Sequence, residues 1–236
     1  MDTIKCQAIV ISAIDYKEKD KLVTLFSFEY GIITANLKSV KTASAKLKFA
    51  KELFCFGEFI IQKPSNVIVG VEVVDTFFDV TKKLEKFYNA CAVVEIVKTI
   101  LQPGEINGQL FLSTLKVLGN ICYENTEDYA LAKYLISIFD AFGYRLALDK
   151  CAECGQPFMS KRWLNLEYGE IVCNACKTIN DIEISNRCHL AMKILNNTDY
   201  EKLKSLKLAK GSEKECLQVL VRNFKKRFNV ELNLLQ

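Results

Sequence analysis

Histidine and tryptophan each occur only once in the 236 residues, and there are only three prolines. A Ser–His or Cys–His catalytic pair could therefore use only His189, and nothing near it in the sequence supports such a pair. The chain also lacks the phosphate-binding motif G-x-x-x-x-G-K-[ST], the dinucleotide motif G-x-G-x-x-G, and the hydrolase motifs H-E-x-x-H and G-x-S-x-G. The sequence gives no positive indication of catalysis, and we expect a protein that is not an enzyme.

Long apolar runs are also absent, since no run approaches the ~18 residues of a transmembrane helix. The apolar stretch at 6–14 follows Asp2 and a single Lys5 and precedes Asp15, so we interpret it as a first β-strand and not as a signal peptide. Six of the ten cysteines are scattered singly among apolar residues, which is typical of reduced thiols in the cytosol. We therefore expect a cytoplasmic protein without a membrane partner.

The chain has little net charge, +4, and its 50% hydrophobic and 25% charged residues are typical of a globular protein. The basic excess lies at the two ends. Residues 1–83 carry 12 basic and 10 acidic side chains and residues 181–236 carry 11 and 7, whereas residues 84–150 carry 6 and 8. Any surface that binds anions should therefore be local.

The first 80 residues contain five strand-like runs separated by turn signals. The runs lie at 4–14, 21–28, 31–37, 53–62 and 67–78. Val67, Val69, Val71 and Val73 alternate at period two in the last run, with Gly70 as a candidate β-bulge. Five strands with a longer link between the third and the fourth predict a small barrel, for which an OB-fold is the first choice and an SH3-like barrel the second.

From residue 81 the apolar pattern becomes helical. It predicts helices from 81 to about 101, around 111–122 and around 131–142, followed by a helix that Ser185 begins and that ends near 195. Ser212 and Glu215 match a capping box, in which the serine caps the last helix and the glutamate reaches back.

Together these patterns predict an α+β protein with an N-terminal five-stranded OB-fold barrel, followed by an α-helical domain with an embedded four-cysteine zinc ribbon. The expected boundaries are 1–80 for the barrel, 81–149 for the first part of the helical domain, 150–178 for the ribbon and 179–236 for the C-terminal part of the helical domain.

Two cysteine pairs, CAEC at 151–154 and CNAC at 173–176, give the spacing C-x2-C-x18-C-x2-C. Two such turns supply four thiolates in a tetrahedron, which is the arrangement that Zn²⁺ takes in structural sites. We predict one structural zinc ion held by Cys151, Cys154, Cys173 and Cys176. The alternative is a redox dithiol, which a single pair near a βαβ pattern would favour. We do not count His189 as a ligand, because the four-sulfur set is already complete.

Five lysines and no acidic residue lie between Glu29 and Glu52. They are Lys38, Lys41, Lys46, Lys48 and Lys51. A solvated loop or helix face would explain such a run. Beside a barrel, however, the link from the third to the fourth strand flanks the face that binds nucleic acid, so we predict that these lysines contact phosphates. Phe49 or Tyr16 could stack on bases there.

A second basic cluster, Arg222 to Arg227, lies near the end of the last helix. Cations at this position suit the helix dipole, and they could also guide a second nucleic-acid strand.

The barrel, the helices and the four-cysteine ribbon, in this order, resemble the bacterial recombination mediator family RecO over essentially the whole chain. The best local match is DYKEKDKLVTLFSFEYG at 15–31, where a charged turn leads into a strand, a phenylalanine and a third strand that starts with glycine. The basic stretch that follows, Phe49 and the cysteine pairs also fit. The family often has arginines and a glycine after the third strand, whereas this chain has Asn36-Leu37 and lysines, which lack the bidentate fork of arginine.

The resemblance implies a non-enzymatic protein of DNA repair and homologous recombination. Such a protein binds single- and double-stranded DNA through its barrel, anneals complementary strands and helps to load a recombinase onto strands coated by single-strand-binding protein (SSB). The implied partners are DNA, RecR and the acidic C-terminal tail of SSB, with the tail site in the helical region, and the implied location is the nucleoid.

Two other functions stay open from the sequence. A zinc-ribbon adaptor of translation or transcription, which binds RNA or another protein, would share the barrel and the metal. A thiol oxidoreductase would use one C-x2-C pair, and a tightly held zinc ion with four protected thiols would exclude it.

Overall fold

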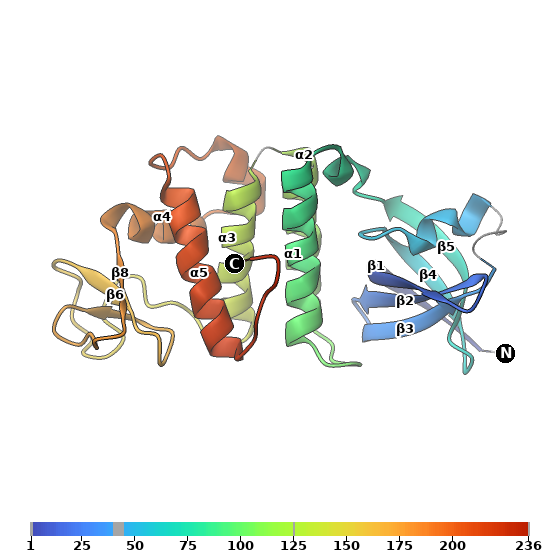
Figure 1. Ribbon diagram of the computed structural model, residues 1–236, viewed down its shortest axis with the longest axis horizontal. Helices are drawn as coiled ribbons and strands as arrows, with labels where there is room; N and C mark the ends of the chain where they lie inside the picture. The colour runs from blue at the N-terminus through green and yellow to red at the C-terminus, as the bar shows by residue number, and fades with distance from the viewer. Residues whose placement is uncertain (1, 40–44, 125, 236) are drawn as a thin grey trace. The chain divides into compact units, whose positions relative to one another are not determined.

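The computed structural model describes residues 2–39, 45–124 and 126–235 (Figure 1). The chain forms two compact units, one of residues 1–90 and 94–112 and the other of residues 91–93 and 113–236. Among the described residues, none of the helices combines the length and the apolar character needed to cross a bilayer.

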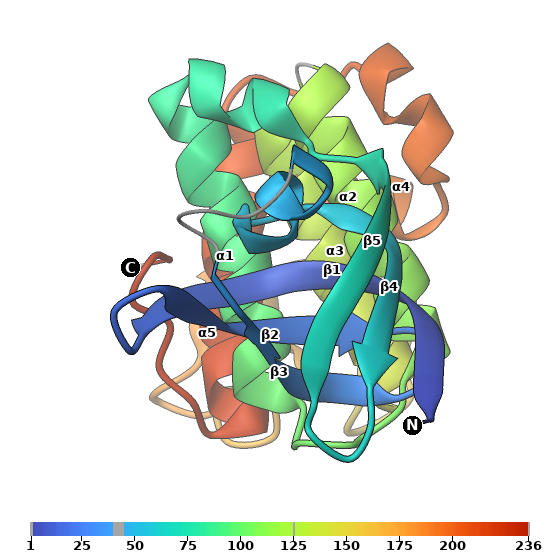
Figure 2. The same cartoon turned by 90° about the vertical axis from the view of Figure 1, so that its right-hand side faces the viewer.

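The first unit contains the five predicted strands, which form a closed barrel in the order β1-β2-β3-β5-β4. Their bounds are β1 Thr3–Tyr16, β2 Asp20–Ser27, β3 Gly31–Leu37, β4 Phe56–Gln62 and β5 Val67–Asp75. Figure 2 looks onto this unit, with β4 and β5 crossing in front of β1, β2 and β3. The long strand β1 pairs with β2 through its second half and with β4 through its first half, and this double pairing closes the barrel.

Alternating side chains fill the barrel. In β4, Gly57, Phe59 and Ile61 face inward and are buried, while the residues between them are partly exposed. Gly57 is required at its position because a Cβ atom there would lie 2.3 Å from the carbonyl oxygen of Glu72 on β5. The prediction of a bulge near Gly70 is confirmed: the register shifts where Ile60 pairs with Gly70 and Ile61 pairs with Ile68.

That bulge changes which valines face the core. Val69 is the extra residue between Ile68 and Gly70, and its side chain is 48% exposed. Val71 and Val73 pack against the barrel core. The strict period-two alternation expected from the sequence therefore holds only beyond the bulge.

The link between β3 and β4 contains a 3₁₀ helix, η1 (Ala45–Lys51), which the sequence patterns did not predict. Its residues Leu47 and Ala50, three positions apart, pack against the barrel core. Lys48 and Phe49 consequently point away from it and are exposed.

Two helical segments complete the first unit: η2 (Phe78–Lys82) and α1 (Leu84–Ile100), of which residues 91–93 are assigned to the second unit. The start of α2 (Gly108–Tyr123) also belongs here. Phe111 packs edge-on against three barrel aromatics, with ring centroids 5.3 Å from Phe26, 5.6 Å from Phe28 and 6.2 Å from Phe56. This aromatic cluster fixes the start of α2 on the barrel.

The second unit is helical, with α3 (Glu127–Ala141), α4 (Asn186–Asn196), η3 (Tyr200–Ser205) and α5 (Ser212–Phe228). α3, α4 and α5 pack against one another, as Figure 1 shows. The fully buried Tyr134 of α3 forms a hydrogen bond of 2.9 Å with Thr114 of α2, which satisfies its hydroxyl within the core.

One predicted helix start is confirmed and the other is wrong. Ser185 caps α4, and its Oγ accepts a hydrogen bond from the N–H of Cys188 at 3.1 Å. Ser212 does not cap α5: its hydroxyl donates to the carbonyl of Ala209, and Gly211 occupies the cap position.

Glu215 does not reach back to its own helix either. It accepts hydrogen bonds from the N–H of Ser185 and from the guanidinium of Arg187. The carboxylate thus joins the start of α4 to α5, and this tertiary contact displaces the local capping box.

Between α3 and α4 lies the cysteine-bearing segment, whose three short strands form a sheet in the order β7-β6-β8. They are β6 (Arg162–Leu164), β7 (Ile171–Cys173) and β8 (Ile182–Ile184). The central strand β6 pairs antiparallel with both neighbours.

Candidate metal centre and candidate nucleic-acid interface

The four predicted cysteine ligands come together in the second unit. The sulfur atoms of Cys151, Cys154, Cys173 and Cys176 all lie within 4.8 Å of one another. Those of Cys154 and Cys173 are 3.9 Å apart. Tetrahedral Zn–S bonds of about 2.3 Å would put sulfurs about 3.8 Å apart, so the cluster fits such an ion.

Backbone hydrogen bonds stabilise the thiolate form of one of these four cysteines. Burial opposes ionisation of the Cys151 thiol, but backbone N–H groups of Cys154, Cys173 and Glu153 outweigh it and lower its pKa to about 7. The Cys173 N–H lies 3.3 Å from this sulfur. In Cys176, a hydrogen bond to the Cys173 thiol, together with burial, raises the pKa to about 12.

Without a cation, four adjacent sulfurs cannot all carry negative charge, and Cys176 is therefore harder to ionise beside the other three cysteines. A divalent ion would remove this repulsion and hold all four residues as thiolates. Since the protein supplies four ligands, the arrangement leaves no coordination position for water or substrate, which is typical of a structural metal site.

Few apolar residues support this segment. Its buried core consists of Cys151, Trp163 and Val172, with Phe158 packed beside them. A core of this size cannot offset the conformational entropy of about 30 ordered residues, so the fold depends on the metal centre and on contacts with the helices.

Arg227 of α5 provides such a contact. Its guanidinium donates to the carbonyl of Gly169 at 2.7 Å and to the carboxylate of Glu170 at 2.7 Å. Gly169 has φ +66°, and a Cβ atom there would lie 2.3 Å from Asn223 Oδ1, so only glycine allows this approach.

His189 is a packing residue of α4. Its Nε2–H donates to the carbonyl of Leu148 at 2.8 Å, and its ring packs edge-on against Phe158. Burial, with the nearby charges of Arg162 and Lys193, lowers its pKa and keeps the ring neutral. It does not belong to the metal-ligand cluster.

The predicted phosphate-binding lysines are only partly placed. Lys38 lies exposed just after β3, Lys48 is exposed on η1, and Lys51 is half-buried at the end of η1. Lys41 falls outside the described residues, and of Lys46 only the backbone, within η1, is described. Among the described residues, Lys38 and Lys48 form no ion pair, so both ammonium groups remain available to an anion.

The predicted stacking residues are at the surface of the first unit. The Phe49 side chain is 44% exposed on η1, next to Lys48. Tyr16 is 42% exposed at the end of β1, with the Lys17 ammonium 5.2 Å from its ring centroid. Both rings can be reached by a ligand, and their role in stacking stays a prediction.

Two family sequence models match the chain. "Recombination protein O N terminal" covers residues 1–77, and "Recombination protein O C terminal" covers residues 82–232. The chain belongs to the recombination protein O (RecO) family.

Relatives in the RecO family align over most of their length. "DNA repair protein RecO" of Desulfitobacterium hafniense (strain DSM 10664 / DCB-2) is 30% identical over 229 residues, which are 93% of this chain and 83% of that protein. The proteins of the same name from Clostridium novyi (strain NT) and Clostridium perfringens (strain 13 / Type A) are 25% and 27% identical. Each match covers 93% of this chain, and 87% and 90% of those proteins. The resemblance stated from the sequence is therefore confirmed at the level of the family.

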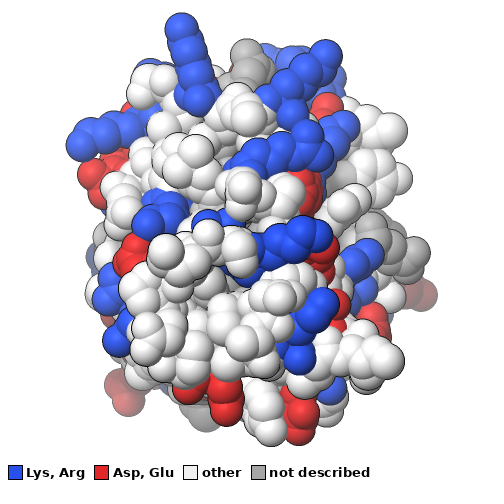
Figure 3. All heavy atoms as spheres, turned by 90° about the vertical axis from the view of Figure 1, so that its left-hand side faces the viewer, with Lys and Arg blue, Asp and Glu red and all other residues white. Residues whose placement is uncertain are grey.

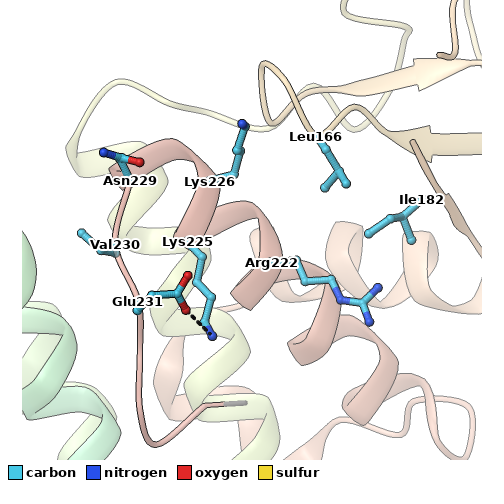
Figure 4. Close-up of a pocket in the computed structure, with 8 residues that line it drawn as sticks. All are labelled: Leu166, Ile182, Arg222, Lys225, Lys226, Asn229, Val230 and Glu231. Carbon is cyan, nitrogen blue, oxygen red and sulfur yellow. Dashed lines mark ion pairs between the residues drawn. The ribbon is translucent and has the colours of Figure 1, made fainter. Parts of the chain in front are cut away.

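The C-terminal part of this RecO-family chain carries a groove of ≈ 670 Å³ beside α5 (Figure 4). Arg222, Lys225 and Lys226 line it from the helix, and Leu166 and Ile182 line it from the cysteine-bearing segment between α3 and α4. A second cavity of ≈ 250 Å³ shares Arg222 and Lys225 and adds apolar side chains. Leu166 and Ile182 were not among the predicted site residues, because only the tertiary fold brings them to α5.

The basic cluster of α5 is partly neutralised. Lys225 forms an ion pair of 3.2 Å with Glu231 (Figure 4), and Arg227 points to Glu170. Arg222 and Lys226 are exposed and form no ion pair with any described residue. Figure 3 shows the face of the second unit that carries the ribbon and α4, where lysine and arginine are more prominent than acidic side chains.

Proposed function

We propose that this chain is a non-enzymatic DNA-binding protein of repair and recombination, which anneals complementary strands and helps to load a recombinase onto SSB-coated DNA. Membership of the RecO family, whose relatives are named DNA repair proteins, is the observation that carries the proposal. The barrel supports it, because the strand order 1-2-3-5-4 with closure onto β1 fits an OB-fold, a fold that binds oligonucleotides.

DNA binding through the barrel requires cations on the first unit. Lys38 and Lys48 form no ion pair with a carboxylate in the part of the chain that the structure describes, and Phe49 offers an exposed ring next to Lys48. Cations that bind two phosphate backbones at once reduce the repulsion between the strands, and annealing follows from the same electrostatics. A protein with this substrate acts at the nucleoid in the cytoplasm, and RecR is the partner that we propose from the family.

The metal ion is proposed to be one structural Zn²⁺ held by Cys151, Cys154, Cys173 and Cys176. Four thiolates in a tetrahedral arrangement favour zinc over the hard cations Ca²⁺ and Mg²⁺, which prefer oxygen ligands. The ion would fix the two cysteine turns against each other and would take no part in DNA chemistry.

The acidic SSB tail is proposed to bind the groove beside α5. An acidic peptide with apolar side chains needs unpaired cations next to an apolar pocket. The groove supplies Arg222 and Lys226 as cations, and Leu166 and Ile182 as apolar contacts.

Substitution of Arg222 tests this groove. Arg222→Glu should weaken binding of a fluorescent SSB tail peptide at least about tenfold, because one charge-assisted contact of about 1.5–3 kcal/mol becomes repulsive. Lys207→Glu changes the charge by the same amount at another exposed position of the second unit and should leave binding unchanged. If both variants bind the peptide like the parent chain, the tail does not bind here.

A gel-shift and annealing assay, with and without SSB, tests the function as a whole. The chain should shift single- and double-stranded oligonucleotides and should accelerate annealing of complementary strands, including strands coated with SSB. An RNA- or protein-binding adaptor would bind the SSB tail no better than a scrambled peptide. Absence of any binding to DNA at low salt would refute the proposal.

A further inference from the structure

The barrel has a seam between β3 and β5. These strands run parallel and pair at a single position, Asn36 with Val67. On the same side of β3, the carbonyl of Ile32 accepts a hydrogen bond from the N–H of Gly104 at 3.2 Å. At the far end, the N–H of Asn36 donates to the carbonyl of Asn66 at 2.7 Å. The seam is therefore closed at both ends.

Thr34 lies midway between these two contacts. Backbone groups of alternate residues point to the same edge of a strand, so the N–H and C=O of Thr34 face the seam, as those of Ile32 and Asn36 do. Neither group has a hydrogen-bond partner among the residues that the structure describes. One donor and one acceptor, from the same residue, are thus left open.

A cavity of ≈ 320 Å³ lies over this position. Its volume is at the lower end of the range of about 300–1,000 Å³ for small-ligand sites. Ile33 and Thr34 line it from β3, Tyr30 from the turn before β3, and Lys63 and Asn66 from the turn between β4 and β5. All of these residues belong to the first unit.

Tyr30 and Lys63 give the cavity its chemical character. The Tyr30 side chain is 41% exposed, so a face of its ring is available for stacking. The Lys63 ammonium donates to Asn66 Oδ1 at 2.7 Å and forms no ion pair with any described carboxylate. The cavity therefore combines an aromatic surface, a cation that no described carboxylate neutralises, and the open backbone groups of Thr34.

We propose that this cavity holds one unstacked base of single-stranded DNA. The Tyr30 ring stacks on the base, the N–H and C=O of Thr34 bond a donor–acceptor edge of the base, and Lys63 contacts the adjoining phosphate. This inference rests on the proposed DNA-binding function and adds a base-binding position that is separate from the lysines after β3.

The seam favours a base over a peptide strand. Because Gly104 and Asn66 close it on either side of Thr34, only one residue of β3 can pair, whereas strand addition needs several consecutive residues. A single base, whose edge carries a donor next to an acceptor, matches the one open N–H and C=O pair of Thr34.

The test compares two labelled strands of equal length and charge, a thymidine oligonucleotide and its abasic counterpart, by fluorescence anisotropy with the full chain. Tyr30→Leu should weaken binding of the oligonucleotide about 5- to 150-fold, the range for one base–aromatic stack, and should leave binding of the abasic strand unchanged. Lys63→Gln should weaken both strands and reduce the salt slope by about 0.7.

Two controls accompany these variants. Tyr30→Phe keeps the stacking ring and should bind like the parent chain. Tyr168→Leu removes a tyrosine that is 62% exposed in the ribbon and should also have no effect. Irradiation of the unmodified chain bound to an iodouracil strand should cross-link Tyr30, and this readout does not depend on the stability of any variant.

The results separate the two proposals. If the parent chain binds neither strand, both the DNA-binding function and the base position are refuted. If it binds the oligonucleotide but Tyr30→Leu binds equally well, or loses both strands to the same extent, only the base position is refuted.

Discussion

At the scale of single residues, the ten cysteines differ by their surroundings. The four metal-ligand candidates lie in one cluster with backbone donors. The other six lie outside this cluster, and in Cys55 burial raises the pKa to about 12. The hydrogen bond with Cys188 and burial likewise raise the pKa of Cys216. The thiols of Cys55 and Cys216 therefore stay protonated at neutral pH and pack as small apolar groups, as their apolar sequence settings predicted.

Neighbouring basic residues of α5 also differ, and the sequence did not distinguish them. The Arg227 side chain is 7% exposed and bonds Gly169 and Glu170, whereas Lys226 beside it is exposed. Arg227 lies three residues after the buried Phe224 and seven after the buried Leu220, so it is on the apolar face of α5. The partners that bind its charge, Gly169 and Glu170, are far away in sequence, and the helix pattern alone does not reveal them.

Arg227→Ala should therefore destabilise the second unit by about 2–3 kcal/mol, because it leaves a partly buried carboxylate and a carbonyl without their donor. The measurement is urea unfolding followed by tryptophan fluorescence, since Trp163 lies in the ribbon core. Lys226→Ala is the matched control and should change the unfolding midpoint very little. Equal effects of the two substitutions would contradict a structural role for Arg227.

At the scale of elements, the sequence predicted the regular strands well. The run at 31–37 coincides with β3, and the runs at 21–28 and 67–78 start within one residue of β2 and β5. Such strands are defined by local alternation of apolar and polar side chains, which the sequence displays directly. β5 ends at Asp75, three residues before the predicted end.

Two local features were not predicted correctly, and tertiary contacts explain both. η1 was not predicted because its apolar residues Leu47 and Ala50 are too few to give a helical period, and contact with the barrel core stabilises them. The capping box of α5 failed because the N-terminus of α4 binds Glu215 instead. In both cases a partner distant in sequence overrides the local pattern.

The ribbon is the element that depends most on an ion. One zinc per chain is expected, and its removal by a chelator should unfold the ribbon, because metal binding of ~10–16 kcal/mol compensates for its small core. Cys173→Ser removes a direct ligand of the metal. It should therefore lower the affinity for zinc by more than about 10–100-fold, which is the loss typical of removing a residue that only hydrogen-bonds to a ligand. Zinc content and thermal unfolding are the measurements.

Cys91→Ser is the matched control, because Cys91 is also half-buried but lies on α1 outside the cluster. It should keep one zinc per chain. A chain that contains no zinc after purification without chelators, with a disulfide in a C-x2-C pair, would support a thiol oxidoreductase instead.

At the scale of the whole molecule, each of the two units has its own candidate binding surface. The sequence indicated the basic segment after β3 because its lysines lie close together in the chain with no acidic residue between them. It did not indicate the cavity over Thr34, which combines residues from four separate segments, at Ile4, 30–34, 63–66 and Gly104. A site of this kind exists only once the barrel has closed, so no local pattern could reveal it.

Salt dependence measures how many phosphates the whole molecule neutralises. If about four are contacted, the logarithm of the affinity for single strands should fall with the logarithm of the salt concentration at a slope near −3. Lys38→Glu with Lys48→Glu should reduce that slope to about −1.5, because two contacts are lost. The pair Lys207→Glu with Lys210→Glu, which are exposed residues of the second unit, has the same total charge and is the control. If the control flattens the slope as much as the test pair, net charge and not the segment after β3 governs DNA binding.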